Sequence, residues 1–273
     1  MSKPSLISLH DQAGQIWQRL RQEANEVRER EPALASHVHA VITSRDGLSD
    51  ALGHLLAEEL ASSHMSALQL REVIDEAHKA DPSIVSAAHN DLIAITERDP
   101  AATLLITPFL YFKGFHALQS YRVAHWLWQK KRTSLALFLQ SRIAKQFSVD
   151  IHPAAVIGQS VMMDHANGIV IGETAVVEDH VSFLHSVTLG GTGKEGGDRH
   201  PKIRKGVMIG AGAKVLGNIE VGHCARIAAG SVVLEDVPPG VTVAGVPAKI
   251  VGKAGCEDPS SKMDQTLPLD NSK

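Results

Sequence analysis

Residues 203–233 read IRKGVMIGAGAKVLGNIEVGHCARIAAGSVV, and an apolar residue returns at every sixth position of this stretch. The series consists of Ile203, Ile209, Val215, Val221, Ile227 and Val233. An α-helix would need a period of 3.6 residues and a half-buried strand a period of two, so neither explains a strict six. A six-residue unit is typical of a short strand followed by a corner, and three such units make one coil of a parallel β-helix.

The same period extends upstream, with two interruptions. It comprises Ile151, Ile157 and Met163, and after a two-residue slip Ile171, Val177, Phe183 and Leu189. An insertion from Gly190 to Lys202 then separates this series from Ile203. Insertions in a solenoid become loops on one face, which is often the binding face. Because Arg199 and His200 crowd the far end of this loop, we expect it to be functional and not a merely tolerated surface loop.

The apolar residues in the first half of the chain follow a different spacing. Apolar residues recur there at three- and four-residue steps, as in Ile16, Trp17, Leu20, Ala24 and Val27. This spacing predicts six or so helices, the last running over 115–147. The predicted fold is α+β: an all-α helical domain over 1–148, then a parallel β-helix over 149–253. The polar tail over 254–273 is predicted to be disordered.

Composition excludes several classes of function. The 273 residues include 27 Lys plus Arg against 30 Asp plus Glu, so the net charge of −3 predicts no nucleic-acid-binding surface. Two cysteines, Cys224 and Cys256, form no disulfide framework and fit a reducing compartment. No secretory signal is evident in Met1–Asp11, and the most apolar stretch, Ala101–Phe112, is too short to span a bilayer. We therefore expect a cytoplasmic protein with no membrane partner.

Several motifs stand in a fixed order along the β-helical half and the helix before it. They are Tyr111–Gln119, Asp150–Ala155, Asp164-His165-Ala166-Asn167-Gly168, Gly172-Glu173-Thr174, Ser186–Lys194, Asp198–Ile203, Ile209–Ala213 and Ala244–Ala248. This ordered set strongly resembles the bacterial serine O-acetyltransferases of the hexapeptide-repeat acyltransferase family. The resemblance implies a left-handed coil. It also implies direct acetyl transfer from acetyl-CoA to the hydroxyl of L-serine, which gives O-acetyl-L-serine and CoA in the first step of cysteine biosynthesis.

A serine hydroxyl is a poor nucleophile at neutral pH, so its attack on a thioester needs a base that removes the proton. His165 matches the family's catalytic histidine, which would later protonate the departing CoA thiolate. Asp150 matches the family's aspartate that orients this imidazole. The two residues are 15 apart and one coil is 18, so the spacing permits contact without proving it. The alternatives are a surface turn residue for His165 and a cap at the domain junction for Asp150.

The resemblance also implies residues that bind serine. Arg199 and His200 match residues that hold the serine carboxylate, and the planar donors of arginine suit that task. Asp99 and Asp164 match acids near the substrate ammonium and hydroxyl, and Glu173 lies in the matching Gly-Glu-Thr motif. The structural alternatives are a solvated loop charge for Arg199 and a helix-stop residue for Asp99.

Part of the long CoA molecule must lie along the prism, where small residues allow close approach to the backbone. The predicted CoA-binding residues are Gly191, Thr192, Ala211 and Ala229, together with Arg226 for a CoA phosphate. The alternative for the small residues is that they only turn corners. Acetyl-CoA is the expected co-substrate, and no metal cofactor is expected.

The resemblance implies an assembly as well. Members form trimers of the β-helix with active sites between neighbouring prisms, and the helical domains join two trimers into a hexamer. L-Cysteine commonly inhibits them by binding at the serine site, and we expect the same here. Many members end in an isoleucine that docks into O-acetylserine sulfhydrylase. This chain ends Leu269-Asp270-Asn271-Ser272-Lys273, which argues against docking by that route.

Three other functions compete with this interpretation. A related acyltransferase could act on a sugar or an antibiotic, although the helical domain and the Arg199–His200 pair favour serine. A metal-dependent hydratase on the same fold would need three histidines, and only His180 and His185 stand at a fitting distance in the sequence. A purely structural scaffold would not need the interrupted repeat.

Overall fold

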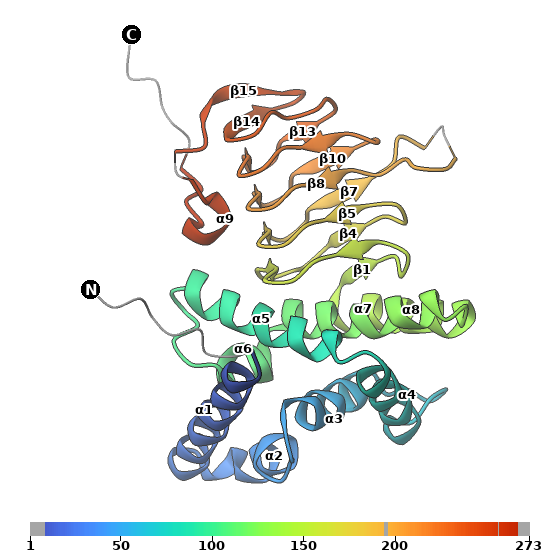
Figure 1. Ribbon diagram of the computed structural model, residues 1–273, viewed down its shortest axis with the longest axis vertical. Helices are drawn as coiled ribbons and strands as arrows, with labels where there is room; N and C mark the ends of the chain where they lie inside the picture. Colours follow the sequence, from blue (N-terminus) through green and yellow to red (C-terminus); the bar gives the residue numbers. More distant parts are fainter. Residues whose placement is uncertain (1–8, 194–195, 256, 267–273) are drawn as a thin grey trace.

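A computed structural model describes residues 9–193, 196–255 and 257–266, in which a helical layer carries a stack of short strands (Figure 1). The helices of the layer are α1 (Leu9–Arg30), η1 (Pro32–Leu34), α2 (Ala35–Val38), η2 (His39–Thr43), α3 (Leu48–Leu60), α4 (Ala67–Ala80), α5 (Ser83–Arg98), α6 (Ile106–Tyr111), α7 (Lys113–Gln129) and α8 (Thr133–Phe147). The predicted helix over 115–147 is two helices, because Lys131 adopts a left-handed backbone with φ 64° between α7 and α8.

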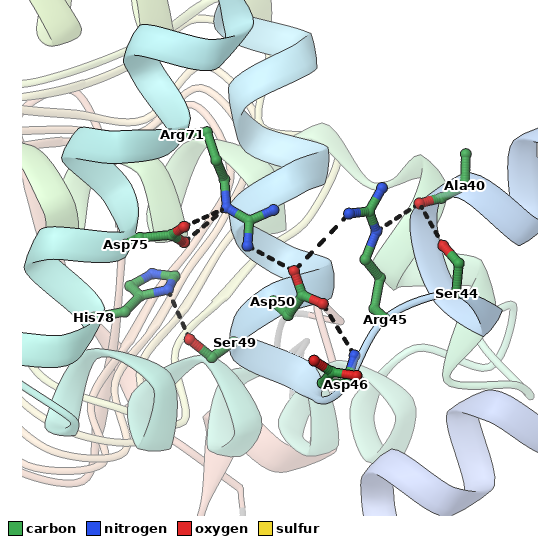
Figure 2. Close-up of polar contacts among 9 residues, drawn as sticks. All are labelled: Ala40, Ser44, Arg45, Asp46, Ser49, Asp50, Arg71, Asp75 and His78. Carbon is green, nitrogen blue, oxygen red and sulfur yellow. Dashed lines mark hydrogen bonds and ion pairs between the residues drawn. The ribbon is translucent and has the colours of Figure 1, made fainter.

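A charged network joins α3 to α4 within the helical layer. Figure 2 shows the Arg71 guanidinium between two carboxylates, 2.6 Å from Asp50 Oδ1 and 2.7 Å from Asp75 Oδ1. Below them in this view, the buried His78 ring lies with Nδ1 3.2 Å from the Ser49 hydroxyl. Burial lowers the pKa of His78 to about 4, so this imidazole is neutral at physiological pH.

Helix α7 packs directly beneath the first coil of strands. It is buried along most of its length, because helices lie on one side of it and the first coil on the other (Figure 1). The Tyr121 hydroxyl donates to the Ala155 carbonyl, and Arg122 donates to the Gly158 carbonyl and pairs with Asp91 at 2.6 Å. Asp91 in turn accepts from the Val161 N–H. These buried polar contacts fix the helical layer against the solenoid.

The strands form three sheets, one on each side of a triangular prism. Sheet A contains β1 (Val149–Ile151), β4 (Ile169–Ile171), β7 (Thr188–Gly190), β10 (Lys214–Leu216) and β13 (Val232–Val233). Sheet B contains β2 (Val156–Ile157), β5 (Val176–Val177), β8 (Lys202–Ile203) and β11 (Glu220–Val221). Sheet C contains β3 (Met162–Met163), β6 (Ser182–Phe183), β9 (Met208–Ile209), β12 (Arg226–Ile227), β14 (Val241–Gly245) and β15 (Ala248–Lys253).

The strand registers explain both interruptions of the repeat. In a regular coil, parallel partners are separated by three six-residue units, as Val170 and Thr188 are. In the first coil Val149 pairs with Ile169, a separation that exceeds the regular one by the two residues of the slip. Around the insertion Thr188 pairs with Lys214, so this coil is longer than a regular one by the extra residues of the loop.

The prediction of the core is confirmed at each of the thirteen positions of the repeat. All of these side chains are buried inside the prism: Ile151, Ile157, Met163, Ile171, Val177, Phe183, Leu189, Ile203, Ile209, Val215, Val221, Ile227 and Val233. The parallel coils and the helical layer likewise confirm the predicted architecture. The change from helix to strand falls at Ser148, a left-handed residue that ends α8.

Each coil turns three corners, and two of them matter for the site. The AB corner, between sheets A and B, comprises 152–155, 172–175, 191–193 with 196–201, and 217–219. The CA corner, between sheets C and A, comprises 164–168, 184–187, 210–213 and 228–231. The insertion therefore projects from the AB corner, whereas the two-residue slip lies in the CA corner of the first coil.

The tail differs in part from the disorder that its polar composition predicts. Helix α9 (Pro259–Lys262) lies beside α5 and the lower coils (Figure 1). Ser260 is fully buried, and its carbonyl accepts from the Ser182 hydroxyl at 2.9 Å. Burial of this turn stabilises order that composition does not reveal. Residue 256 and residues 267–273 of the predicted tail lie outside the described residues.

Candidate active site

His165 lies in an expanded corner of the first coil. The inward residues Met163 and Ile171 flank this CA corner and stand eight positions apart in place of six. The backbone accommodates the extra length with left-handed conformations at His165 (φ 54°), Ala166 (φ 57°) and Gly168 (φ 71°). As a result the His165 side chain projects outward and is 76% exposed.

A pocket of about 500 Å³ opens beside this histidine. It is lined by residues from the end of α5, the start of α7 and the expanded corner: Asp99, Ala101, Tyr111, Phe112, Lys113, Gly114, Met163, Asp164 and His165. The structure thus brings together three of the predicted site residues. His165 Nε2 lies 3.8 Å from Asp164 Oδ2.

The two carboxyl groups of the pocket affect each other. The pKa of Asp164 is raised because burial disfavours its charged form and because the negative charge of Asp99 is close, although His165 acts in the opposite direction. A cation that binds between the two carboxylates would reduce the repulsion between their negative charges. The pocket is therefore suited to a small ligand that carries an ammonium group next to a group that His165 can deprotonate.

A second histidine stands above the first on the same corner. The rings of His165 and His185 are 6.0 Å apart in an edge-to-face arrangement. From the sequence, His185 was predicted only as a possible metal ligand. The two histidines stand one expanded coil apart in the sequence, and this spacing was the signal that could have placed them together. His180 lies at a different corner, between sheets B and C. Within the described ranges no group of three or more His, Cys, Asp or Glu residues is placed to hold a metal ion.

Arg199 and His200 lie together at the AB corner, where Thr174 organises them. The Thr174 hydroxyl oxygen accepts from the backbone N–H groups of both residues, at 3.0 and 3.1 Å. The His200 Nδ1 accepts from the Thr174 N–H and lies 2.8 Å from its hydroxyl, so the proton of the neutral ring sits on Nε2. Burial and the charge of Arg199 lower the pKa of His200, which keeps the ring neutral. The Glu173 carboxylate accepts from Arg199 Nη2 at 2.6 Å, and this bond lowers the Glu173 pKa.

Gly172 allows the His200 ring to pack on the backbone. A Cβ atom at this position would lie 2.0 Å from His200 Nε2 and 2.1 Å from its Cδ2. The backbone of Gly172 does not adopt a left-handed conformation, so space alone requires a glycine here.

Asp150 lies between the two corners. It points outward from the middle of β1, and its Oδ1 accepts from Gln140 Nε2 of α8 at 2.7 Å. No contact joins Asp150 to His165 among the described residues of this single chain. The predicted pairing of the two residues therefore stays a prediction.

The two clusters lie on opposite edges of sheet A. Six residues separate one corner from the next, which spans roughly 20 Å at about 3.3 Å per residue. His165 and Asp164 on the CA edge therefore cannot contact the same small molecule as Arg199 on the AB edge of the same chain. A site that uses both clusters has to combine two copies of the chain.

The predicted CoA residues divide between these edges. Ala211 and Ala229 continue the CA corner above His185, in a ladder of backbone bonds from Gly212 N–H to His185 O and from Gly230 N–H to Ala211 O. Gly191 and Thr192 stand at the AB corner with Arg199. Arg226 lies apart in β12, buried, where it donates to the Thr242 hydroxyl and the Asp264 carbonyl. A role for Arg226 in phosphate binding would need the segment at Asp264 to move away.

A prism of hexapeptide coils with an exposed histidine at a carboxylate-lined pocket defines an acyltransferase of the hexapeptide-repeat class. Two family models agree: "Serine acetyltransferase, N-terminal" matches residues 16–120, and "Bacterial transferase hexapeptide (six repeats)" matches residues 200–235. A serine acetyltransferase of Salmonella typhimurium is 58% identical over 250 residues, which cover 92% of each chain. The chain belongs to the serine acetyltransferase family, and it is an acyltransferase.

Solved structures agree with this assignment along nearly the whole chain. A serine acetyltransferase in complex with cysteine is 56% identical with a TM-score of 0.91, and the match covers 93% of this chain and 98% of that one. The enzyme from Brucella abortus strain S19 in complex with coenzyme A is 52% identical with a TM-score of 0.89, over 90% and 99% of the two chains. Among the described residues no helix has the length and apolar character needed to cross a membrane.

Proposed function

We propose that this chain transfers the acetyl group of acetyl-CoA to the hydroxyl of L-serine, and that His165 is the general base. The single observation that carries the proposal is the pocket in which Asp99, Asp164 and His165 meet at the expanded corner. The coenzyme A bound to the related Brucella enzyme supports acetyl-CoA as the co-substrate. The products are CoA and O-acetyl-L-serine, and the reaction is the first step of cysteine biosynthesis.

The transfer is direct in this proposal. The serine oxygen attacks the thioester carbonyl carbon while His165 takes the hydroxyl proton. The tetrahedral adduct then breaks its carbon–sulfur bond, and the departing CoA thiolate takes the proton back from His165. Two features support direct transfer: His165 is largely exposed, and the predicted CoA residues Ala211 and Ala229 lie along the same edge.

Serine binding follows from the charges of the two edges. Asp99 and Asp164 face the substrate ammonium, and Arg199 and His200 of a second copy receive its carboxylate. Three prisms arranged with sheet A toward a common axis bring the CA edge of one copy beside the AB edge of the next. Asp150, on the outward face of sheet A, then lies near the junction, where it would orient the imidazole. The trimer belongs to the proposal, as does its pairing into a hexamer through the helical layers.

L-Cysteine is the expected inhibitor. It carries the same ammonium and carboxylate as L-serine, with a thiol in place of the hydroxyl, so the same charged groups would hold it. The related enzyme solved in complex with cysteine supports this part of the proposal.

Thiol release from acetyl-CoA in the presence of L-serine tests the proposal. The decisive variant is His165→Asn, because asparagine tolerates the left-handed backbone of this position and removes only the base. His180→Asn is the matched control, since His180 has nearly the same backbone (φ 58°) at a different corner. Loss of a general base lowers kcat by about 10²–10⁴-fold, whereas the control keeps wild-type activity. Release that does not depend on serine, or an equal effect of both variants, would contradict the proposal.

A further inference from the structure

We propose that the first turn of α7, through Lys113 and Gly114, positions His165 for catalysis; the inference rests on the function proposed above. Neither residue needs to touch the substrate for this role. Both contact the expanded corner, where the coil departs from its six-residue period on the CA edge.

The corner needs outside support. His165 and Ala166 are adjacent non-glycine residues in the left-handed region, which is unfavourable for any residue with a Cβ atom. Such conformations persist only where the surroundings fix them. The exposed His165 ring makes few contacts that could fix this backbone conformation. The position of the imidazole therefore depends on the residues that pack against the backbone of the corner.

Gly114 supplies the close contact below the corner. A Cβ atom on Gly114 would lie 2.1 Å from the Met163 carbonyl oxygen and 3.0 Å from the Ala166 Cβ. Ala166 itself is fully buried. The absence of a side chain at Gly114 thus allows the helix to sit directly on the segment that carries His165. Any added atom has to push that segment away.

Lys113 supplies a polar contact to the same corner. Its ammonium donates to the side-chain oxygen of Asn167, two residues after His165. The Asn167 carbonyl accepts from the Ser186 N–H at 2.6 Å, which ties the same residue to the next coil. His165 therefore lies between Met163 and Ala166, which Gly114 contacts, and the following Asn167 is held by Lys113 and by the second coil.

The geometry points to a positioning effect on kcat. A misplacement of about 1 Å at a catalytic group lowers the rate by up to about 100-fold. We expect Lys113→Met and Asn167→Ala each to lower kcat by about tenfold with a KM for serine within about twofold of wild type. The double variant should be no slower than the slower single variant, because both changes break the same contact. Lys113→Arg should recover most of the rate.

Gly114→Ala is the stronger perturbation, and Gly14→Ala is its control, because a Cβ at Gly14 meets nothing within 4 Å. The Gly114 variant should lose about 10–100-fold in kcat. Because this variant risks misfolding, the single and double variants of Lys113 and Asn167 decide whether the positioning role holds. Thermal unfolding is measured for every protein.

The outcomes separate the inference from the proposed function. Wild-type enzyme without serine-dependent release would refute the function. Active wild type with an unchanged kcat in Lys113→Met would refute the positioning role. A raised KM for serine at constant kcat would also refute it, since Lys113 would then act on the bound substrate through the nearby acids Asp99 and Asp164. Losses that add in the double variant would overturn it too, because the two residues would then act separately.

Discussion

Replacement of Gly172 by alanine should disable the cluster of Arg199 and His200, which is proposed to bind the serine carboxylate, without unfolding the prism. The new Cβ would lie 2.0 Å from His200 Nε2, whereas ordinary contacts begin near 3.4 Å. The ring must therefore move by the difference between these two distances, which is enough to break its 2.8 Å contact with the Thr174 hydroxyl. Because that hydroxyl also fixes the backbone of Arg199, the whole cluster shifts.

The expected magnitudes follow from these contacts. A lost hydrogen bond costs about 1 kcal/mol and overpacking about 1–3 kcal/mol, whereas the change from glycine to alanine returns about 0.4–1 kcal/mol. The free energy of unfolding should fall by about 1–3 kcal/mol. A charged hydrogen bond to substrate contributes about 1.5–3 kcal/mol, so the KM for serine should rise by about 10–100-fold.

Urea denaturation and steady-state thiol release measure the two effects. Gly196→Ala is the matched control, because it lies in the inserted loop that carries His200 and its Cβ would meet nothing within 4 Å. In a His200→Ala background the clash is gone, so Gly172→Ala should no longer destabilise the protein. An equal loss of stability with and without the His200 ring would refute the reasoning.

Three further predictions concern the helical layer and the inhibitor. Asp91→Asn leaves the buried Arg122 without its ion pair, so urea denaturation should show a loss of about 3–5 kcal/mol; a loss below about 1 kcal/mol would contradict this. The pKa of His78 falls from 6.5 unfolded to about 4 folded, so its contribution to stability is complete above pH 6.5 and declines by roughly 3 kcal/mol toward pH 4. A His78→Phe variant should lack this part of the pH dependence, and an unchanged profile would show that other groups cause it. L-Cysteine should raise the apparent KM for serine without lowering kcat, and a pattern independent of serine would place it elsewhere.

The sequence predicted the prism well because a strict period of six leaves little freedom. Each inward position from Ile151 to Val233 is buried as the period requires. The period also showed a two-residue interruption between Met163 and Ile171. In the structure these two extra residues lie in the corner that exposes His165. A periodic fold transfers positions directly from sequence to space, so residues at one corner, such as His165 and His185, follow from counting coils.

The rest depends on contacts that no period encodes. The bond between Thr174 and His200 spans the insertion, and the length of that loop hides their register. The burial of Arg226 depends on a tail whose composition predicts disorder. Asp150 is separated from the other site residues within one chain. A sequence does not say whether a neighbouring copy brings such residues together.

A mixing experiment tests the central claim, that one serine site joins the His165 edge of one copy to the Arg199 edge of another. His165→Asn and Arg199→Met chains, each inactive alone, are co-expressed, and serine-dependent thiol release is measured on the purified mixed assembly. In random trimers about a quarter of the junctions combine an intact His165 with an intact Arg199. About a quarter of wild-type activity should therefore return. Activity that stays at the level of the two separate variants, in assemblies shown to be mixed, would contradict it.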